Sequence, residues 1–164
     1  MNLEKLFEMQ KGLDQHIEEQ HNLQNEDLFD RKVLALLVEL GELANETRCF
    51  KFWSLKPASD KEVILEEFVD GIHFILSLGI VAGFTAKTIQ LTETPPQTNS
   101  LTEQFLTTYA KIEQFRSSRT KQAYQEMFQE CLQIAQLLGF SAVEIEQAYI
   151  KKNEVNYERQ QQGY

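Results

Sequence analysis

The sequence predicts an all-α protein, a helical bundle of about six helices. Apolar residues recur at three- and four-residue spacing through almost the whole chain, which is the pattern of amphipathic helices. Only three prolines and seven glycines interrupt the 164 residues, and no convincing strand pattern emerges. With 42% hydrophobic residues, a chain of this length can bury one core, so we expect one domain over residues 1–164.

Composition changes mark where these helices begin and end. The segment NLQNEDL breaks the first helix, and TETPPQTNS at residues 92–100 has the composition of an exposed linker, with two consecutive prolines. The six expected helices cover residues 3–21, 28–52, 59–81, 101–115, 121–138, and 141 to the C-terminus.

Three local signals support the helix boundaries. The second helix ends ahead of Pro57, because the residue before a proline is pushed out of helical geometry. Ser59 stands three residues before Glu62, and Ser141 stands three residues before Glu144. Both pairs match the capping box that opens a helix, so we expect one at the third helix and one at the last.

Charge and composition exclude several classes of protein. A net charge of −9 with a pI near 4.9 repels a phosphate backbone, so nucleic-acid binding by a broad basic face is not expected. No run of about 18 apolar residues is present, and MNLEKLFEMQ alternates apolar and charged residues, unlike a signal peptide. We therefore expect a cytoplasmic protein without membrane segments. Cys49 and Cys131 do not form a CxxC pair, which gives no zinc or disulfide signal.

Acidic residues interrupt two strongly apolar helices. In VLALLVELGELANE, residues 33–38 are apolar around the whole helix, which predicts a buried helix, yet Glu39, Glu42 and Glu46 follow on one face. In ILEEFVDGIHFILSLGIV, Glu67 and Asp70 are three residues apart among apolar neighbours. The two helices thus carry an ExxE and an ExxD pair in stretches where solvated acids are not expected.

Such clustered acids need compensation. Like charges at helical spacing disfavour a helix, and a buried unpaired carboxylate costs several kcal/mol. Mg²⁺ compensates directly, because it takes oxygen ligands and keeps waters and phosphates in its shell. Gly41 and Gly71, between the paired acids, would let the two helices approach. The alternative is ion pairing with Lys or Arg on a solvated face, but two such pairs together favour metal.

With these acids placed, the sequence resembles the all-α nucleotide pyrophosphohydrolases of the MazG-like superfamily, whose metal motif is ExxE followed by ExxD on the next helix. The blocks ELGELANETRCFKFWS, EEFVDGIHFILSLGI and YIKKNEVNYERQQQGY are similar to the dimeric dUTPases of bacteria and their phages, over nearly the whole chain. The resemblance implies a homodimer that cleaves dUTP, and also dUDP, with dUTP giving dUMP and pyrophosphate. It implies two or more Mg²⁺ ions, with Mn²⁺ as a substitute.

The resemblance also implies roles for the acids. Four carboxylates match the metal-ligand positions: Glu39, Glu42, Glu67 and Asp70. Glu39 is our preferred catalytic residue, which would orient or deprotonate the attacking water. Three residues would contact and orient the metal ligands without binding the metal themselves: Glu46, Glu66 and His73.

The C-terminal segment supplies cations and amides. Three polar residues lie four and three positions apart and so share one helical face: Lys152, Asn156 and Arg159. Their side chains can bind phosphate oxygens. By charge alone, this segment could equally be the surface of an amphipathic helix end. The family pattern KN-x-x-N-x-x-RQ-x-x-GY implies that Lys152, Asn153, Asn156, Arg159 and Tyr164 contact the nucleotide.

A base needs an apolar surface and a few hydrogen bonds. Trp53, in an aromatic cluster beside Lys51, is the expected stacking residue, although a place in the core at a helix end is the alternative. Gln10 and Asp14 match a uracil-side Gln of the family and a position often held by Asn, which leaves the role of Asp14 open. The expected polar substrate contacts are Gln10, Asp14, Asn22, Asn45 and Lys51.

Three other functions remain open from the sequence. A related pyrophosphohydrolase could act on another substrate, such as dCTP. Asp70-x-x-His73 resembles half of a di-iron site, but His16 and His21 lack a Glu three residues before them. A helical dimerisation module could pair its acids across an interface and would need no metal.

Overall fold

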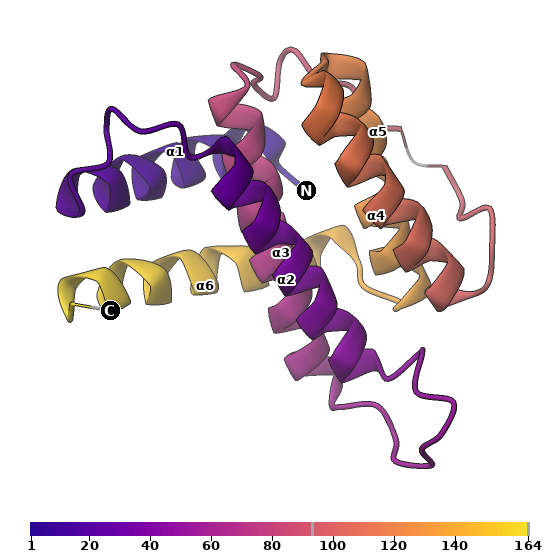
Figure 1. Ribbon diagram of the computed structural model, residues 1–164. Coiled ribbons are helices and arrows are strands. Elements are labelled where there is room, and N and C mark those ends of the chain that lie inside the picture. The colour runs from indigo at the N-terminus through magenta and orange to yellow at the C-terminus, as the bar shows by residue number, and fades with distance from the viewer. Residues whose placement is uncertain (93, 164) are drawn as a thin grey trace.

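The computed structural model describes residues 1–92 and 94–163, and these residues form six α-helices and no strand (Figure 1). The all-α prediction is therefore confirmed. The helices are α1 (Leu3–Gln20), α2 (Phe29–Thr47), α3 (Lys61–Val81), α4 (Leu101–Ser118), α5 (Lys121–Leu137) and α6 (Ala142–Gln161).

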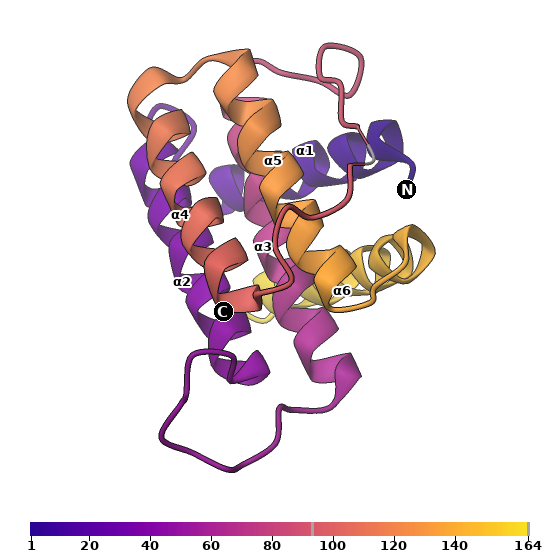
Figure 2. The same cartoon turned by 90° about the vertical axis from the view of Figure 1, so that its right-hand side faces the viewer.

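The six helices pack as three pairs, and α3 lies at the centre of the bundle. α2 and α3 form an antiparallel pair in the middle, and α4 and α5 form a second pair that packs on it, α4 against α2 and α5 against α3 (Figure 2). α1 and α6 form the third pair and both contact α3 (Figure 1). They run parallel, because Asn2 bonds Glu146 at their starts and His21 bonds Gln160 at their ends. α3 thus contacts four other helices.

The core follows from this central position. α3 is buried over most of its second half, and its Gly71 faces α2, where an added Cβ would lie at van der Waals distance from Leu36 and Leu40. Gly41, which we expected at the same interface, instead faces Tyr109 of α4. Which neighbouring helix a residue faces depends on how three helices pack together. Residue spacing within one helix does not specify that packing.

The expectation that α2 is buried on all sides is wrong. Leu34 is 62% exposed and Val38 is 50% exposed, although both belong to the apolar run ahead of Glu39. α2 packs against α3 and α4, and neither covers the face that carries these two side chains. The apolar run therefore supplies both a core face and an exposed apolar stripe.

Two of the local boundary signals have different outcomes. The Ser141–Glu144 capping box is formed, with both of its reciprocal hydrogen bonds, and it opens α6. The box expected at Ser59 is absent, because α3 begins at Lys61 after Asp60. The Ser59 hydroxyl and N–H both donate to Glu46 at the end of α2 instead.

α2 also ends earlier than the sequence predicts. Its last residue is Thr47, and Arg48 adopts a left-handed conformation with φ of 58°. The Arg48 side chain then donates to the Lys56 carbonyl and to the Ser54 hydroxyl, which closes the following segment into a loop. This loop hangs below the α2–α3 pair in Figure 2. None of the described helices is both long and apolar enough to cross a membrane.

Candidate metal and nucleotide site

Three carboxylates from two helices converge at the α2–α3 interface. Glu39 lies on α2, and Glu67 and Asp70 lie one turn apart on α3. One carboxylate oxygen from each lies within 4.8 Å of the others. Their three-residue spacing puts the α3 acids on one face, and the antiparallel packing of α2 brings Glu39 to that face. The donors are all hard oxygens, which suit Mg²⁺ or a similar divalent cation.

Glu42 and Glu46 lie near this triad but outside it. Glu42 is exposed one turn beyond Glu39, and its charge helps to raise the pKa values of Glu39 and Glu67. Glu46 accepts hydrogen bonds from Ser59 and, at 3.3 Å, from the Asn45 amide. The structure thus brings three of the four expected ligands together and leaves Glu42 at the rim.

The triad resists ionisation. Burial, followed by the charges of Asp70 and its acidic neighbours, raises the pKa of Glu39 to about 7. Burial is also the main reason that the pKa values of Glu67 and Asp70 are raised. A cation among these oxygens would favour their charged forms, so the electrostatics of the cluster match a metal site.

Lys152 binds the acids directly. Its Nζ lies 2.7 Å from Asp70 Oδ2 and 2.7 Å from Glu66 Oε1, with the lysine side chain almost fully buried. Burial alone would lower the pKa of Lys152, but the hydrogen bonds to Asp70 and Glu66 outweigh it and raise that pKa. The hydrogen bond from Lys152 lowers the pKa of Glu66. Glu66 therefore supports Asp70 through this lysine.

A cavity of about 330 Å³ opens beside the triad, between α1, α2, α3 and α6. Glu39 and Asp70 line it together with Asn156 and Arg159 of α6. The charge of Arg159 lowers the pKa values of Glu66 and Asp70, so the guanidinium acts on the acidic end. The remaining walls include apolar side chains: Leu13, Ile17, Leu28 and Phe74.

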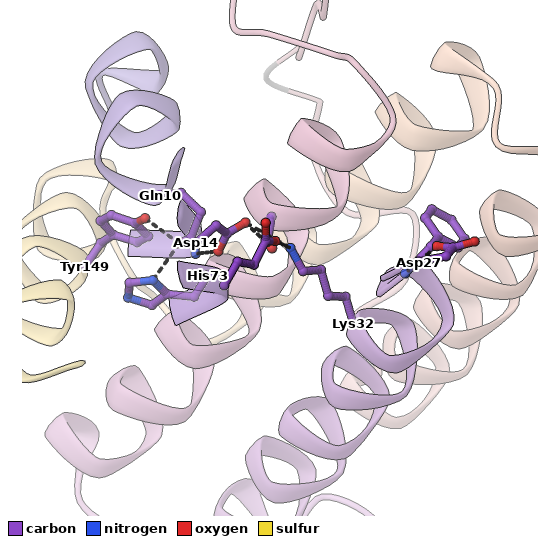
Figure 3. Close-up of polar contacts among 9 residues, drawn as sticks. Gln10, Asp14, Asp27, Lys32, His73 and Tyr149 are labelled. Atoms are coloured by element: carbon purple, nitrogen blue, oxygen red, sulfur yellow. Dashed lines mark hydrogen bonds and ion pairs between the residues drawn. The ribbon is translucent and has the colours of Figure 1, made fainter. Parts of the chain in front are cut away.

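Buried polar groups form a chain of hydrogen bonds along this cavity (Figure 3). Gln10 Oε1 accepts from the Tyr149 hydroxyl at 2.7 Å and lies 2.8 Å from His73 Nδ1. Gln10 Nε2 donates to Asp14 Oδ1 at 2.7 Å. Because a carboxylate accepts and cannot donate, the orientation of the Gln10 amide is fixed by Asp14.

His73 is neutral in this network. Burial lowers its pKa to about 3, and its ring stacks on Tyr149 with centroids 4.1 Å apart. Since Gln10 Oε1 only accepts, His73 Nδ1 carries the proton and Nε2 is left with its lone pair. Nε2 is buried without a hydrogen-bond partner among the described residues. His73 thus positions Gln10 and presents an unused acceptor.

Two further residues at this site, Lys32 and Ser77, were not predicted from the sequence. Lys32 Nζ lies 3.2 Å from Asp14 Oδ2, and the Ser77 hydroxyl donates to the same oxygen at 2.5 Å. Lys32 lies about two helical turns before Glu39, and Ser77 lies about two turns after Asp70. That spacing puts Lys32 on the same helical face as Glu39, and Ser77 on the same face as Asp70. This shared face is the feature of the sequence that could have identified both residues.

Several expected substrate contacts do not line this cavity. Asn22 is exposed in the turn after α1, and Asn45 bonds Lys51 at the end of α2. Trp53 is 64% exposed and packs against Phe50 and Phe52 in the loop after α2, so the alternative of a core position is also not seen. Asn153 is buried, with its amide nitrogen unpaired among the described residues. Tyr164 lies outside the described residues.

Comparison with known proteins shows the family to which the chain belongs. A family model described as dUTPase matches residues 2–164. No curated protein matched the chain. The family match covers both acidic helices, all residues that line the cavity, and the C-terminal segment. The chain therefore belongs to the dUTPase family, in its all-α form, and is a hydrolase with dUTP diphosphatase activity.

Proposed function

We propose that this site hydrolyses dUTP, and also dUDP, to dUMP in a reaction that depends on Mg²⁺. The observation that carries the proposal is the convergence of Glu39, Glu67 and Asp70 at a cavity with a polar far wall. Glu42, at the rim, would join these ligands. We propose that the site binds two or more Mg²⁺ ions and that Mn²⁺ can replace them, as the resemblance implies.

The donor set supports this metal assignment. Carboxylate oxygens suit Mg²⁺, and the raised pKa values of Glu39, Glu67 and Asp70 are those of acids that a cation would stabilise. When bound, the metal would supply Lewis-acid stabilisation of the phosphates and a lowered pKa for the attacking water. Glu39 would orient that water or accept its proton, because its carboxylate lies beside the other proposed ligands and lines the cavity.

The α6 residues would hold the phosphate chain. Asn156 and Arg159 line the cavity close to Asp70, and Lys152 adds a cation at the same end. An arginine can bind phosphate oxygens through two parallel N–H donors, which fixes orientation as well as charge. The apolar walls and the polar network around Gln10 and Asp14 would then receive the nucleoside.

The assembly is also a proposal. The exposed stripe of Leu34 and Val38 on α2 is the kind of apolar surface that an interface covers, which supports a homodimer. The shared core of all six helices supports one domain over residues 1–164. The cytoplasmic location stays a prediction from the sequence.

Pyrophosphate release from dUTP, dCTP, dTTP and the common ribonucleotides would test the function, with and without Mg²⁺. We expect dUTP to be preferred and the reaction to need metal. Glu39→Gln and Asp70→Asn should each lower kcat by at least about 100-fold, as expected for removal of a metal ligand or base. Glu113→Gln, on the exposed face of α4, is the matched control. Equal rates on dUTP, dTTP and dCTP would overturn the assignment.

A further inference from the structure

The ammonium of Lys152 lies between two carboxylates that line different hollows of the molecule. Asp70 lines the cavity beside the triad, whereas Glu66 lines a separate groove of about 400 Å³ between α3 and α6. Lys152 also lines this groove, and its Nζ lies 2.7 Å from an oxygen of each acid. Glu66 and Asp70 are four residues apart and therefore share one face of α3, so one side chain of α6 can reach both.

The two acids differ in what else they can bind. Asp70 belongs to the triad and its side chain is 18% exposed, whereas Glu66 lies outside the triad and is 57% exposed. Successive residues of a helix are turned by about 100° from one another, so Glu67 reaches the triad and its neighbour Glu66 does not. A cation bound at the triad would therefore take Asp70 as a ligand and leave Glu66 to Lys152.

Bound metal would weaken one of the two contacts of Lys152. A divalent cation at Asp70 adds positive charge close to the ammonium, and like charges at short range repel each other. A lysine side chain is long and flexible, so an ammonium that lost both acids could turn outward along the groove into solvent. Glu66 prevents this, because it holds the same nitrogen from the groove side. Lys152 then stays at the end of the cavity where the phosphates are expected.

We propose that Glu66 is a positioning residue, which retains Lys152 at the phosphate end of the site when metal occupies the triad. The resemblance implies that Glu66 orients a metal ligand, whereas its contact assigns it to the lysine. The inference rests on the function proposed above, in which Lys152 binds the phosphates. It differs from a role as metal ligand, which would not need Lys152, and from a general effect of negative charge, which Glu62 would share.

A double-mutant cycle of Glu66→Gln and Lys152→Met tests the inference. The ligand is a dUTP analogue with an imido group between the α- and β-phosphates, titrated by calorimetry in saturating Mg²⁺. Each single variant should weaken binding by at least about fivefold, because a charge-assisted contact to phosphate is lost or displaced. In the Lys152→Met background, Glu66→Gln should change the affinity by less than about twofold.

The sign of this effect separates positioning from simple electrostatics. Removal of a negative charge should by itself favour an anionic ligand, so weaker binding by Glu66→Gln requires that Lys152 has moved. Glu62→Gln is the matched control, because Glu62 is exposed one turn before Glu66 and lines the same groove. It removes the same charge and should bind the analogue within about twofold of the wild type. Full affinity of Glu66→Gln for the analogue would overturn the inference.

Two further ligands exclude other causes. Deoxyuridine carries no phosphate, so Glu66→Gln should bind it as the wild type does; equal losses for deoxyuridine and the analogue would refute a positioning role. Any change that Glu66→Gln makes to Mn²⁺ affinity without nucleotide should vanish in Lys152→Met, and a loss that persists there would identify Glu66 as a metal ligand instead. A weakened Lys152→Met beside an unaffected Glu66→Gln would overturn this inference alone. A wild type that does not bind the analogue would overturn the proposed function as well.

Discussion

The ammonium of Lys152 on α6 lies 2.7 Å from Oδ2 of Asp70 on α3, in the position of a counter-cation to the acidic triad. The same nitrogen binds Glu66, so one ammonium of α6 offsets part of the charge of two carboxylates of α3. A divalent cation at Asp70 would compete with Lys152 for the same oxygen. The metal-free fold and the proposed metal site are therefore coupled through this one contact.

Lys152→Met should destabilise the metal-free protein, because Asp70 keeps its partly buried charge and loses its partner. Loss of about 1–3 kcal/mol would lower Tm by roughly 3–10 °C. Mg²⁺ should then raise Tm more in the variant than in the wild type, since no ammonium competes for Asp70. Thermal unfolding in EDTA and in Mg²⁺ measures both effects, with the exposed neighbour Lys151→Met as control. The same fall in Tm for both variants would contradict the role of Lys152.

Stability of the metal-free protein should fall as pH rises through neutrality. The pKa of Glu39 is about 7 in the folded state against 4.5 ordinarily, so the folded state binds the proton more tightly. The stabilisation is complete below about pH 4.5 and is lost as pH rises through 7, and the raised pKa values of Glu67 and Asp70 act in the same direction.

Glu39→Gln tests this pH dependence, because glutamine resembles the protonated acid. In EDTA it should raise Tm by about 2–4 °C at pH 8 and change it little at pH 5. Glu19→Gln, on the exposed side of α1, should leave the pH profile of unfolding as it is in the wild type. A wild-type Tm that rises between pH 5 and 8 would disagree with the burial of Glu39.

Divalent metal should stabilise the protein, and Asp70→Asn should remove most of that effect. At a concentration 100 times Kd, bound Mg²⁺ or Mn²⁺ contributes about 2.7 kcal/mol, or a rise in Tm of roughly 5–10 °C. Metal affinity should fall on acidification below pH 7, because protons compete for Glu39. An Asp70→Asn protein that responds to Mg²⁺ like the wild type would exclude Asp70 as a ligand.

Two glycines of α3 should respond oppositely to alanine. A Cβ at Gly79 would lie 2.4 Å from the hydroxyl oxygen of Tyr124, which is fully buried and donates to the Ile75 carbonyl. Gly79→Ala should therefore cost about 1–3 kcal/mol through overpacking. Gly71→Ala meets only ordinary contacts at 3.8 Å and beyond, and should be neutral or gain up to about 1 kcal/mol of helix propensity. Denaturant unfolding of both variants makes the comparison, and equal costs would contradict the geometry.

Much of this protein was determined by its sequence. The helices follow from apolar periodicity, and the Ser141 cap follows from groups three residues apart, since both depend on contacts within a turn or two. The same local geometry placed Glu67 and Asp70 on one face. By contrast, the end of α2 depends on Arg48 binding back to Ser54 and Lys56, which no helical pattern encodes.

Tertiary structure decided which helices meet and therefore what each polar residue binds. Asp14, Lys32 and Ser77 come from α1, α2 and α3, so no spacing within one segment joins them. Lys152 has the helical spacing of a phosphate ligand, but the packing of α6 on α3 gives it Asp70 and Glu66 as partners. Periodicity reports which face of a helix is apolar, whereas the partner of a buried charge depends on how several helices pack around it.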